Sequence, residues 1–271
     1  MSAATVIIPA HDEAGYIAAC LEAVFASQLD DVELQVIVVA NGCSDETAKI
    51  ARSHTGAGRD LEVIETQTGG KLNALGLGDG AAGHGTRIYL DADVIVSPQL
   101  IMELTGALNG AVPRYASGTP VVAPARSRIT RNYARFWQNL PFVKQGVPGF
   151  GIFAVNEAGR GRWGDWPDII SDDTFVRLSF TPEERVRVPA TYSWPMVEGW
   201  RPLVRVRRRQ NRGVAEIAGC YPERMKNDDT VRLGASEIAA LAARDPAGFL
   251  VYGAVSLAVR LPGPDGWVRG R

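Results

Sequence analysis

Two acidic residues one position apart, Asp91 and Asp93, directly follow a short apolar run. That run, Ile88 to Leu90, has the continuous apolar character of a buried strand. An extended backbone at the strand end would point both carboxylates to the same side, where they would suit a hard cation such as Mg2+ or Mn2+. Alternatively, both acids solvate a turn before Ser97-Pro98, a pair that resembles a helix N-cap followed by proline. Asp-x-Asp therefore needs support from the rest of the chain before it predicts a metal site.

Polar side chains also follow two earlier strand-like segments. Asp12 and Glu13 come after the strand-like residues 5–8, and Asn41 follows the strand-like residues 34–39. The carboxyl ends of parallel strands share one edge of a sheet, and ligands bind at that edge in open α/β folds. These side chains are therefore expected to converge with the two later aspartates on one cleft.

Two further segments precede helix-like sequence, and each admits two interpretations. Asn41-Gly42 is typical of a turn, and Ser44 or Asp45 is typical of a helix N-cap, so this segment could be structural, binding or both. The tandem glycines before Lys71 would let the backbone approach a phosphate, with Lys71 supplying positive charge. Because the full Gly-x4-Gly-Lys-Ser/Thr pattern is missing, an NTPase is not expected.

The elements that must position these residues alternate along the first half of the chain. Strand-like runs occupy residues 5–8, 34–39, 61–66 and 86–90, and helical spacing marks residues 15–25, 45–52 and 71–77. This order predicts an α/β fold with a mostly parallel sheet and helices on both faces. The second half adds strands at 115–123 and 152–155, helices at 128–138, 236–244 and 247–261, and a loose tail at 262–271.

The composition is that of an ordinary globular protein. The 271 residues carry a net charge of -1 with 46% hydrophobic and 22% charged residues, which argues against general nucleic-acid binding. The three cysteines lack metal or redox spacing and suggest the reducing cytoplasm, and no export signal is expected at the N-terminus. No run is long enough for a transmembrane segment. Residues 249–261 are therefore expected to form a core helix, with peripheral contact at the inner face of the membrane as the alternative.

Four motifs, taken in order, resemble the N-terminal half of family 2 glycosyltransferases. They are Val6-Ile-Ile-Pro-Ala-His-Asp-Glu13, Ala40-Asn-Gly-Cys-Ser-Asp-Glu-Thr47, Gly70-Lys-Leu-Asn-Ala-Leu75 and Asp91-Ala-Asp93. Each motif is loose, but their order over about ninety residues makes a specific match. The resemblance implies a single domain of the GT-A fold. In it, residues 1–110 would bind the donor, and residues 111–271 would bind the acceptor and carry the catalytic base and the C-terminal helices.

The same resemblance implies an activity and its co-reactants. A family member of this kind would transfer a sugar, with inversion, from a UDP- or GDP-sugar to a hydroxyl of a saccharide, glycolipid or small metabolite. Magnesium or manganese would assist. Site roles follow for the matching positions: Pro9, His11 and Glu13 around the base, Asp45 at the base or ribose, Asn41, Lys71 and Asp172 elsewhere in the donor site, Asp93 on the metal, and Asp91 at the ribose or metal. Many relatives carry Asn rather than Asp12, which leaves the role of that residue open.

The second half contains another acidic pair, in Ile169-Ile-Ser-Asp-Asp-Thr174. It resembles the family's Asp-Asp motif, whose second acid is the general base, so the resemblance implies that role for Asp173. A positioned carboxylate can take the proton of a sugar hydroxyl as the new bond forms, and Asp172 adds like charge that favours a proton on Asp173. The alternative is that either acid caps a helix at 174–178.

Two more segments of the second half have a structural and a functional interpretation. Gly146-Val-Pro-Gly-Phe-Gly151 would line the cleft near the sugar in this family, or would form a plain turn. The basic run at 200–212 is most often a solvated helix face. Its alternatives are an anionic lipid contact or a diphosphate contact through Arg208, Arg209 and Gln210, although the Trp that often follows in membrane synthases is missing.

Two other classes of protein remain as alternatives. A sugar-phosphate nucleotidyltransferase would share a related fold and a carboxylate-bound Mg2+, but it would carry a Gly-rich basic loop after the first strand. Residues 9–15 contain no such loop. A non-catalytic nucleotide-sugar-binding protein would bind the donor without turnover, so donor hydrolysis or transfer distinguishes it from an enzyme.

Overall fold

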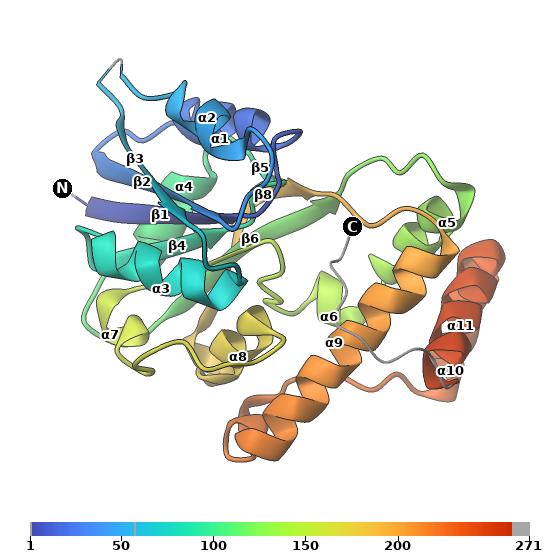
Figure 1. Ribbon diagram of the computed structural model, residues 1–271. Coiled ribbons are helices and arrows are strands. Elements are labelled where there is room, and N and C mark those ends of the chain that lie inside the picture. The colour runs from blue at the N-terminus through green and yellow to red at the C-terminus, as the bar shows by residue number, and fades with distance from the viewer. Residues whose placement is uncertain (1, 57, 262–271) are drawn as a thin grey trace. The chain divides into compact units, whose positions relative to one another are not determined.

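Figure 1 shows a computed structural model that describes residues 2–56 and 58–261. The chain forms two compact units. Unit 1 comprises Met1–Val121, Gly149–Asp168 and Ser179–Trp194, and unit 2 comprises Val122–Pro148, Ile169–Leu178 and Pro195–Arg271. The loose tail predicted at 262–271 lies outside the described residues.

Unit 1 is built on a sheet with the strand order β3-β2-β1-β4-β7-β6-β8-β5. The pairs β1–β2, β2–β3 and β1–β4 are parallel, whereas β4–β7, β6–β7 and β5–β8 are antiparallel. Strand β1 lies between β2 and β4, so the strand order reverses there, and in open α/β sheets ligands bind outside the carboxyl ends of strands at such a reversal. The strands are β1 (Ser2–Ala10), β2 (Val32–Asn41), β3 (Asp60–Thr66), β4 (Thr86–Leu90), β5 (Ile95–Val96), β6 (Tyr115–Val122), β7 (Ile152–Val155) and β8 (Arg185–Trp194).

Helices cover both faces of this sheet, as its alternating side chains require. Val36 and Val38 of β2 pack in the larger core with α1 and α4, whereas Ile37 and Val39 pack on the other face with α3. Successive residues of a strand point to opposite faces, so a strand buried on both sides is apolar throughout. The helices of unit 1 are α1 (Ile17–Phe25), α2 (Thr47–Arg52), α3 (Lys71–Ala81), α4 (Leu100–Ala107) and α7 (Glu157–Arg160), with a short turn η1 (Pro182–Glu184).

Unit 2 is helical. Helix α11 packs on α5 through stacked rings, with Tyr252 lying 5.4 Å from Tyr133 and 5.1 Å from Phe136 between ring centroids. No helix among residues 2–56 and 58–261 combines the length and apolar character that a bilayer crossing requires. The helices of unit 2 are α5 (Arg128–Trp137), α6 (Pro141–Lys144), α8 (Asp172–Leu178), α9 (Trp200–Cys220), α10 (Ala235–Arg244) and α11 (Pro246–Arg260), with a short turn η2 (Arg224–Asn227).

The predicted α/β class with its mostly parallel arrangement of the first strands is confirmed. The long antiparallel strand β8 was not predicted. The predicted N-cap at Ser97 is wrong, because α4 begins at Leu100 after Gln99. The hydroxyl of Ser97 instead accepts a hydrogen bond from the Thr191 N–H (3.2 Å), where β5 meets β8.

Candidate functional site

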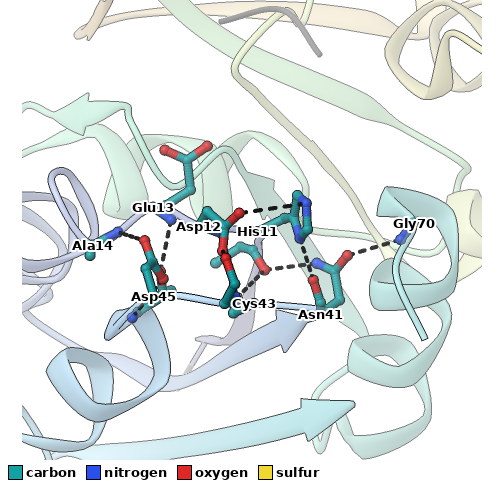
Figure 2. Close-up of polar contacts among 11 residues, drawn as sticks. His11, Asp12, Glu13, Ala14, Asn41, Cys43, Asp45 and Gly70 are labelled. Atoms are coloured by element: carbon teal, nitrogen blue, oxygen red, sulfur yellow. Dashed lines mark hydrogen bonds and ion pairs between the residues drawn. The ribbon is translucent and has the colours of Figure 1, made fainter. Parts of the chain in front are cut away.

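The loop after β1 begins the site. Pro9 lies in β1, one residue before the strand ends. The Nδ1 atom of His11 lies 2.7 Å from the carbonyl oxygen of Asn41. Because a carbonyl only accepts hydrogen bonds, this ring nitrogen carries the proton. His11 therefore joins the loop after β1 to the end of β2 (Figure 2).

Asp12 has a left-handed backbone, with φ at 51°. Its carboxylate accepts hydrogen bonds from the Ser44 N–H (2.6 Å) and the Ser44 hydroxyl (3.1 Å), and its own N–H donates to the sulfur of Cys43 (3.5 Å). Asp and Asn are the non-glycine residues that adopt this conformation most readily. Position 12 thus requires a left-handed residue with a short acceptor, a requirement that Asp and Asn both meet.

Asn41 is a buried hub for three chain segments. Only 2% of its surface is exposed. Its side-chain amide donates to the Ala10 carbonyl (2.8 Å), and its side-chain oxygen accepts from the Gly70 N–H (3.0 Å). Next to it, Gly42 has φ at 57°, and a Cβ there would lie 3.2 Å from the Cα of Gly69. Glycine at position 42 therefore allows the loop after β2 to approach the start of α3.

Asp45 joins the loop after β2 to the loop after β1. Its carboxylate accepts hydrogen bonds from the Thr47 N–H (3.0 Å), the Thr47 hydroxyl and the Ala14 N–H (3.1 Å). The Thr47 hydroxyl in turn accepts from the Glu13 N–H (2.7 Å). Partial burial alone would raise the pKa of Asp45, but these hydrogen bonds outweigh it, so the pKa is lowered. Asp45 is thus a charged structural link, and its contact with a base or ribose stays a prediction.

The Lys71 ammonium and the Asp91 carboxylate form an ion pair of 2.8 Å. Lys71 is the first residue of α3, and Asp91 is the first residue after β4. Both side chains are partly exposed, at 42% and 35%, so each remains accessible to a ligand. The lysine predicted to supply positive charge to a phosphate and the first acid of Asp-x-Asp are therefore neighbours.

The backbone around Asp93 is a turn, not the extended strand end that was expected. The Val94 N–H donates to the Asp91 carbonyl (3.1 Å), and the Asp91 N–H donates to the Gly151 carbonyl (2.8 Å). The turn leaves Asp93 only 7% exposed. The Gly-rich segment predicted to line the cleft thus lies directly beside Asp91.

Another possible ligand cluster lies in the loops after β1 and β2. Among the described residues, one atom each from His11, Asp12 and Cys43 lies within 4.8 Å of the other two. All three residues are partly buried, and burial raises the pKa of the Cys43 thiol. A protonated thiol is a weak metal ligand. The oxygen-only pair Asp91 and Asp93 has the chemistry that Mg2+ and Mn2+ prefer.

In unit 2, Asp172 and Asp173 are the first two residues of α8. Asp172 is 7% exposed, and Asp173 accepts hydrogen bonds from the Thr174 N–H (2.6 Å) and the Thr174 hydroxyl (3.3 Å). The helix begins earlier than predicted, so both acids lie in its first turn, where the helix dipole favours negative charge.

The arginines predicted to contact a diphosphate lie in the middle of α9. Arg208 donates to the carbonyl oxygens of Ala258 (2.8 Å) and Leu261 (3.0 Å), at the end of α11. Arg209 and Gln210 are partly buried. Arg208 thus has a structural role in unit 2, since an arginine can satisfy the free carbonyls at a helix C-terminus.

Residues that hold α8 in place escaped the sequence interpretation. A Cβ at Gly213 of α9 would lie 2.1 Å from the Ser171 hydroxyl oxygen, and Glu216 accepts a hydrogen bond from the Ile170 N–H (2.7 Å). At the other side, Arg177 pairs with Asp229 at 2.6 Å. The glycine within a 21-residue helix was the available signal, because such a glycine often marks a close approach.

Comparison with known proteins agrees with this arrangement. The family model described as Glycosyl transferase family 2 matches residues 5–156. Glycosyltransferase AglE of Haloferax volcanii is 32% identical over 107 residues, which are 39% of this chain and 35% of that protein. The match thus spans about a third of the length of that curated relative.

Solved structures share the fold at low sequence identity. The mannosyltransferase PcManGT from Pyrobaculum calidifontis, in complex with GDP-Man and Mn2+, is 18% identical with a TM-score of 0.58, covering 96% of this chain and 76% of that chain. Glucosyl-3-phosphoglycerate synthase from Mycobacterium tuberculosis, in complex with Mn2+, UDP and glucosyl-3-phosphoglycerate, is 19% identical with a TM-score of 0.52, covering 84% and 82%. TarS 1-349 of S. aureus, in complex with UDP, is 13% identical with a TM-score of 0.56, covering 90% and 70%.

Proposed function

The chain belongs to glycosyl transferase family 2 and is a glycosyltransferase, and from this premise we propose that it moves a sugar from a nucleoside-diphosphate donor to an acceptor hydroxyl with inversion. The observation that carries the proposal is the Asn41 hub, which gathers the ends of β1 and β2 and the start of α3 at one edge of the sheet. Next to that edge, Lys71 and Asp91 pair across the loops after β3 and β4. Both the switch point of the sheet and a partly exposed lysine at a helix start suit a nucleotide diphosphate.

The loops after β1 and β2 would receive the nucleoside. Pro9, His11 and Glu13 would surround the base, and Asp45 would contact the base or ribose while it keeps the two loops together. These loops are rigid because His11, Asn41 and Asp45 are each hydrogen-bonded to backbone groups of another segment. A preformed pocket loses less conformational entropy on binding than a mobile one. UDP- and GDP-sugars are the proposed donors, because solved structures of similar fold contain UDP or GDP-Man.

The diphosphate would lie beside Lys71 and the aspartate turn. Asp93, with Asp91 as a second ligand, would hold Mg2+ or Mn2+, because a single turn supplies two hard oxygen donors and Lys71 already balances the charge of Asp91. When bound, the cation would stabilise the negative charge that develops on the departing diphosphate. Lys71 would add positive charge to the same group.

Asp173 is the proposed general base. Its carboxylate would take the proton of the acceptor hydroxyl as that oxygen bonds to the anomeric carbon and the bond from this carbon to the diphosphate breaks. A single displacement of this kind inverts the anomeric configuration. Asp172 would stay in the donor site.

Thermal unfolding of the full chain tests the donor site. UDP-, GDP- and dTDP-sugars are added in Mn2+, Mg2+ or EDTA, because a ligand that binds only the folded state raises the unfolding midpoint. We expect one nucleotide class to raise the midpoint with a divalent cation and to lose that effect in EDTA. No shift with any nucleotide in the presence of metal would overturn the proposed site, and an equal shift in EDTA would overturn the cation.

A further inference from the structure

The outward face of α11 is apolar along its whole length. Leu250, Leu257 and Leu261 leave 69%, 64% and 64% of their surfaces exposed, and Ala247 and Ala254 are exposed as well. Spacings of three and four residues place the four residues from Ala247 to Leu257 on one side of the helix, and Leu261 is its C-cap residue. These five residues form what is called here the leucine stripe.

The opposite side of α11 is already packed on unit 2. Val255 is fully buried, and Tyr252 packs against Phe136 of α5. Arg208 of α9 holds the C-terminal end through the Leu261 carbonyl, and Figure 1 shows α11 running beside α9 and α10. The helix is therefore fixed by one face, and the leucine stripe is not needed for the core of the unit. Contiguous exposed apolar surface of this kind marks an interaction surface, whereas single exposed leucines are ordinary.

Basic residues flank α11 at both of its ends. Arg244 at the end of α10 and Arg260 at the end of α11 are both exposed. Asp245, between the two helices, is neutralised by Arg135, which donates to both of its carboxylate oxygens (2.9 and 2.6 Å). Glu237 is the other acid of residues 235–261, and it accepts a hydrogen bond from the backbone at the start of α10.

The same excess of positive charge extends over unit 2. Residues 122–148 contain five basic residues and no acidic one, and residues 195–261 contain more basic than acidic residues. The net charge of -1 for the whole chain hides this excess because unit 1 is acidic.

We propose that α11 binds the surface of an anionic lipid bilayer through the leucine stripe. The leucines would enter the boundary between headgroups and acyl chains, and Arg244 and Arg260 would lie near the lipid phosphates. A second copy of this chain would also cover the leucines, but it would bring the same basic residues against each other, and like charges disfavour that contact. An anionic bilayer offers an apolar boundary to the leucines and negatively charged headgroups to the arginines. Binding would not depend on sugar transfer.

Sedimentation of the full chain with lipid vesicles tests this proposal. One set of vesicles contains phosphatidylcholine alone, and the other contains phosphatidylcholine mixed with phosphatidylglycerol. We expect the protein to bind the mixed vesicles and to dissociate as salt screens the charges. The double variant Leu250→Asp/Leu257→Asp should bind at least about tenfold more weakly, because two apolar side chains become charged. The variant Arg244→Glu/Arg260→Glu should lose binding to the mixed vesicles as well.

A matched control separates the leucine stripe from a general effect of added charge. Val112 in unit 1 is 64% exposed, so Val112→Asp makes the same kind of change elsewhere and should bind like the unchanged chain. The donor-dependent midpoint of the leucine variant confirms that it is folded. Equal vesicle binding by the leucine variant, or no binding by the unchanged chain, would overturn the proposal. A dimer in solution that the leucine variant abolishes, without vesicle binding, would assign the surface to a second copy instead.

Discussion

Asn41 connects more segments of the candidate site than any charged residue does. Its amide group is buried and satisfied on both sides, by the Ala10 carbonyl and the Gly70 N–H. A buried amide that loses a partner costs about 1–3 kcal/mol, so these two bonds specify how the loops after β1 and β2 meet the start of α3. The aspartates of the site are different, because each combines a structural hydrogen bond or ion pair with a charge that a ligand can use. Asp91, held by Lys71 and partly exposed, is the clearest example.

Asp173→Asn should abolish sugar transfer and leave donor binding nearly intact. The amide keeps the shape of the side chain but cannot accept the proton of the acceptor hydroxyl, and loss of a general base costs about 100-fold or more in rate. Released diphosphate measures transfer, and calorimetry measures donor binding. Asp31→Asn, at an exposed loop residue of unit 1, is the matched control and should retain transfer. A parallel loss of donor binding would show that Asp173 has a different role.

Asp93→Asn should weaken donor binding in Mn2+ by about tenfold or more, because an amide oxygen is a poorer ligand for a hard cation than a carboxylate. Binding in EDTA should change much less, so the variant should lose most of the difference between the two conditions. Calorimetric titration of a nucleoside diphosphate under both conditions measures this. Transfer by the unchanged chain at full rate in EDTA would contradict the assignment of Asp93 to a metal.

Helix α8 illustrates how one element is positioned by others in unit 2. Its start is held by α9, where Glu216 accepts from the Ile170 N–H and Gly213 lies against Ser171. Near its end, Arg177 pairs with Asp229 after η2. The orientation of the proposed base therefore depends on a 21-residue helix that follows it in the sequence. A helix of seven residues has little stability of its own, so such tertiary contacts must supply it.

Gly213→Ala should disturb α8 without disturbing the donor-binding loops. The new Cβ would lie 2.1 Å from the Ser171 hydroxyl oxygen, and overpacking of this kind costs about 1–3 kcal/mol. We expect a lower unfolding midpoint and slower transfer, with the same midpoint shift on adding donor. Gly219→Ala is the control in the same helix, because no atom lies within 4 Å of its Cβ position. That control should keep its stability or gain up to about 1 kcal/mol. Equal behaviour of the two variants would refute the close contact.

At the scale of the whole molecule, ionisable groups in both units stabilise the folded state most strongly near neutral pH. Burial would raise the pKa of Asp45 in unit 1 and of Asp228 in unit 2, but hydrogen bonds to their carboxylates outweigh it, so both pKa values lie below 3.8. Burial also raises the pKa of Tyr133 to about 12 and that of Tyr89 well above 10. Folding stabilises the charged form of the two aspartates and the neutral form of the two tyrosines. Protonation of the aspartates in acid and deprotonation of the tyrosines in alkali therefore both destabilise the folded state.

The free energy of unfolding should therefore be highest near neutral pH. A carboxylate with a lowered pKa contributes fully above its unfolded value, and this contribution is lost as the pH falls through the folded value. A tyrosine with a raised pKa contributes below about pH 10, and this contribution is lost as the pH rises toward the folded value. Urea unfolding at about pH 3, 7 and 11 measures the loss of stability in acid and in alkali. Asp228→Asn should be less stable at pH 7 and should lose less stability on acidification, whereas Asp31→Asn should follow the unchanged chain. Greater stability at acid pH would contradict this account.

Local patterns in the sequence were sufficient for the first half of the fold. Residues 5–8 and 34–39 lie within the strands β1 and β2, because a strand covered on both faces is mostly apolar, and the predicted parallel sheet is confirmed. The order of the four motifs was also sufficient for the family, which is confirmed. Strand β8 was missed because its partner β5 lies about ninety residues earlier and is only two residues long. The roles of the individual site residues stay predictions.

The sequence by itself determined the elements of unit 1, the family and the polar residues that follow its strands, because hydrophobic periodicity and motif order are local properties of the chain. Only the tertiary structure decided that Asp91 and Asp93 lie in a turn, that Lys71 pairs with the first of them, and that α9 holds the start of α8. It also decided which side of α11 is buried and which side presents the leucine stripe. The physical reason is the same in each case. These features depend on contacts between segments far apart in the sequence, and no local pattern specifies the partner in such a contact.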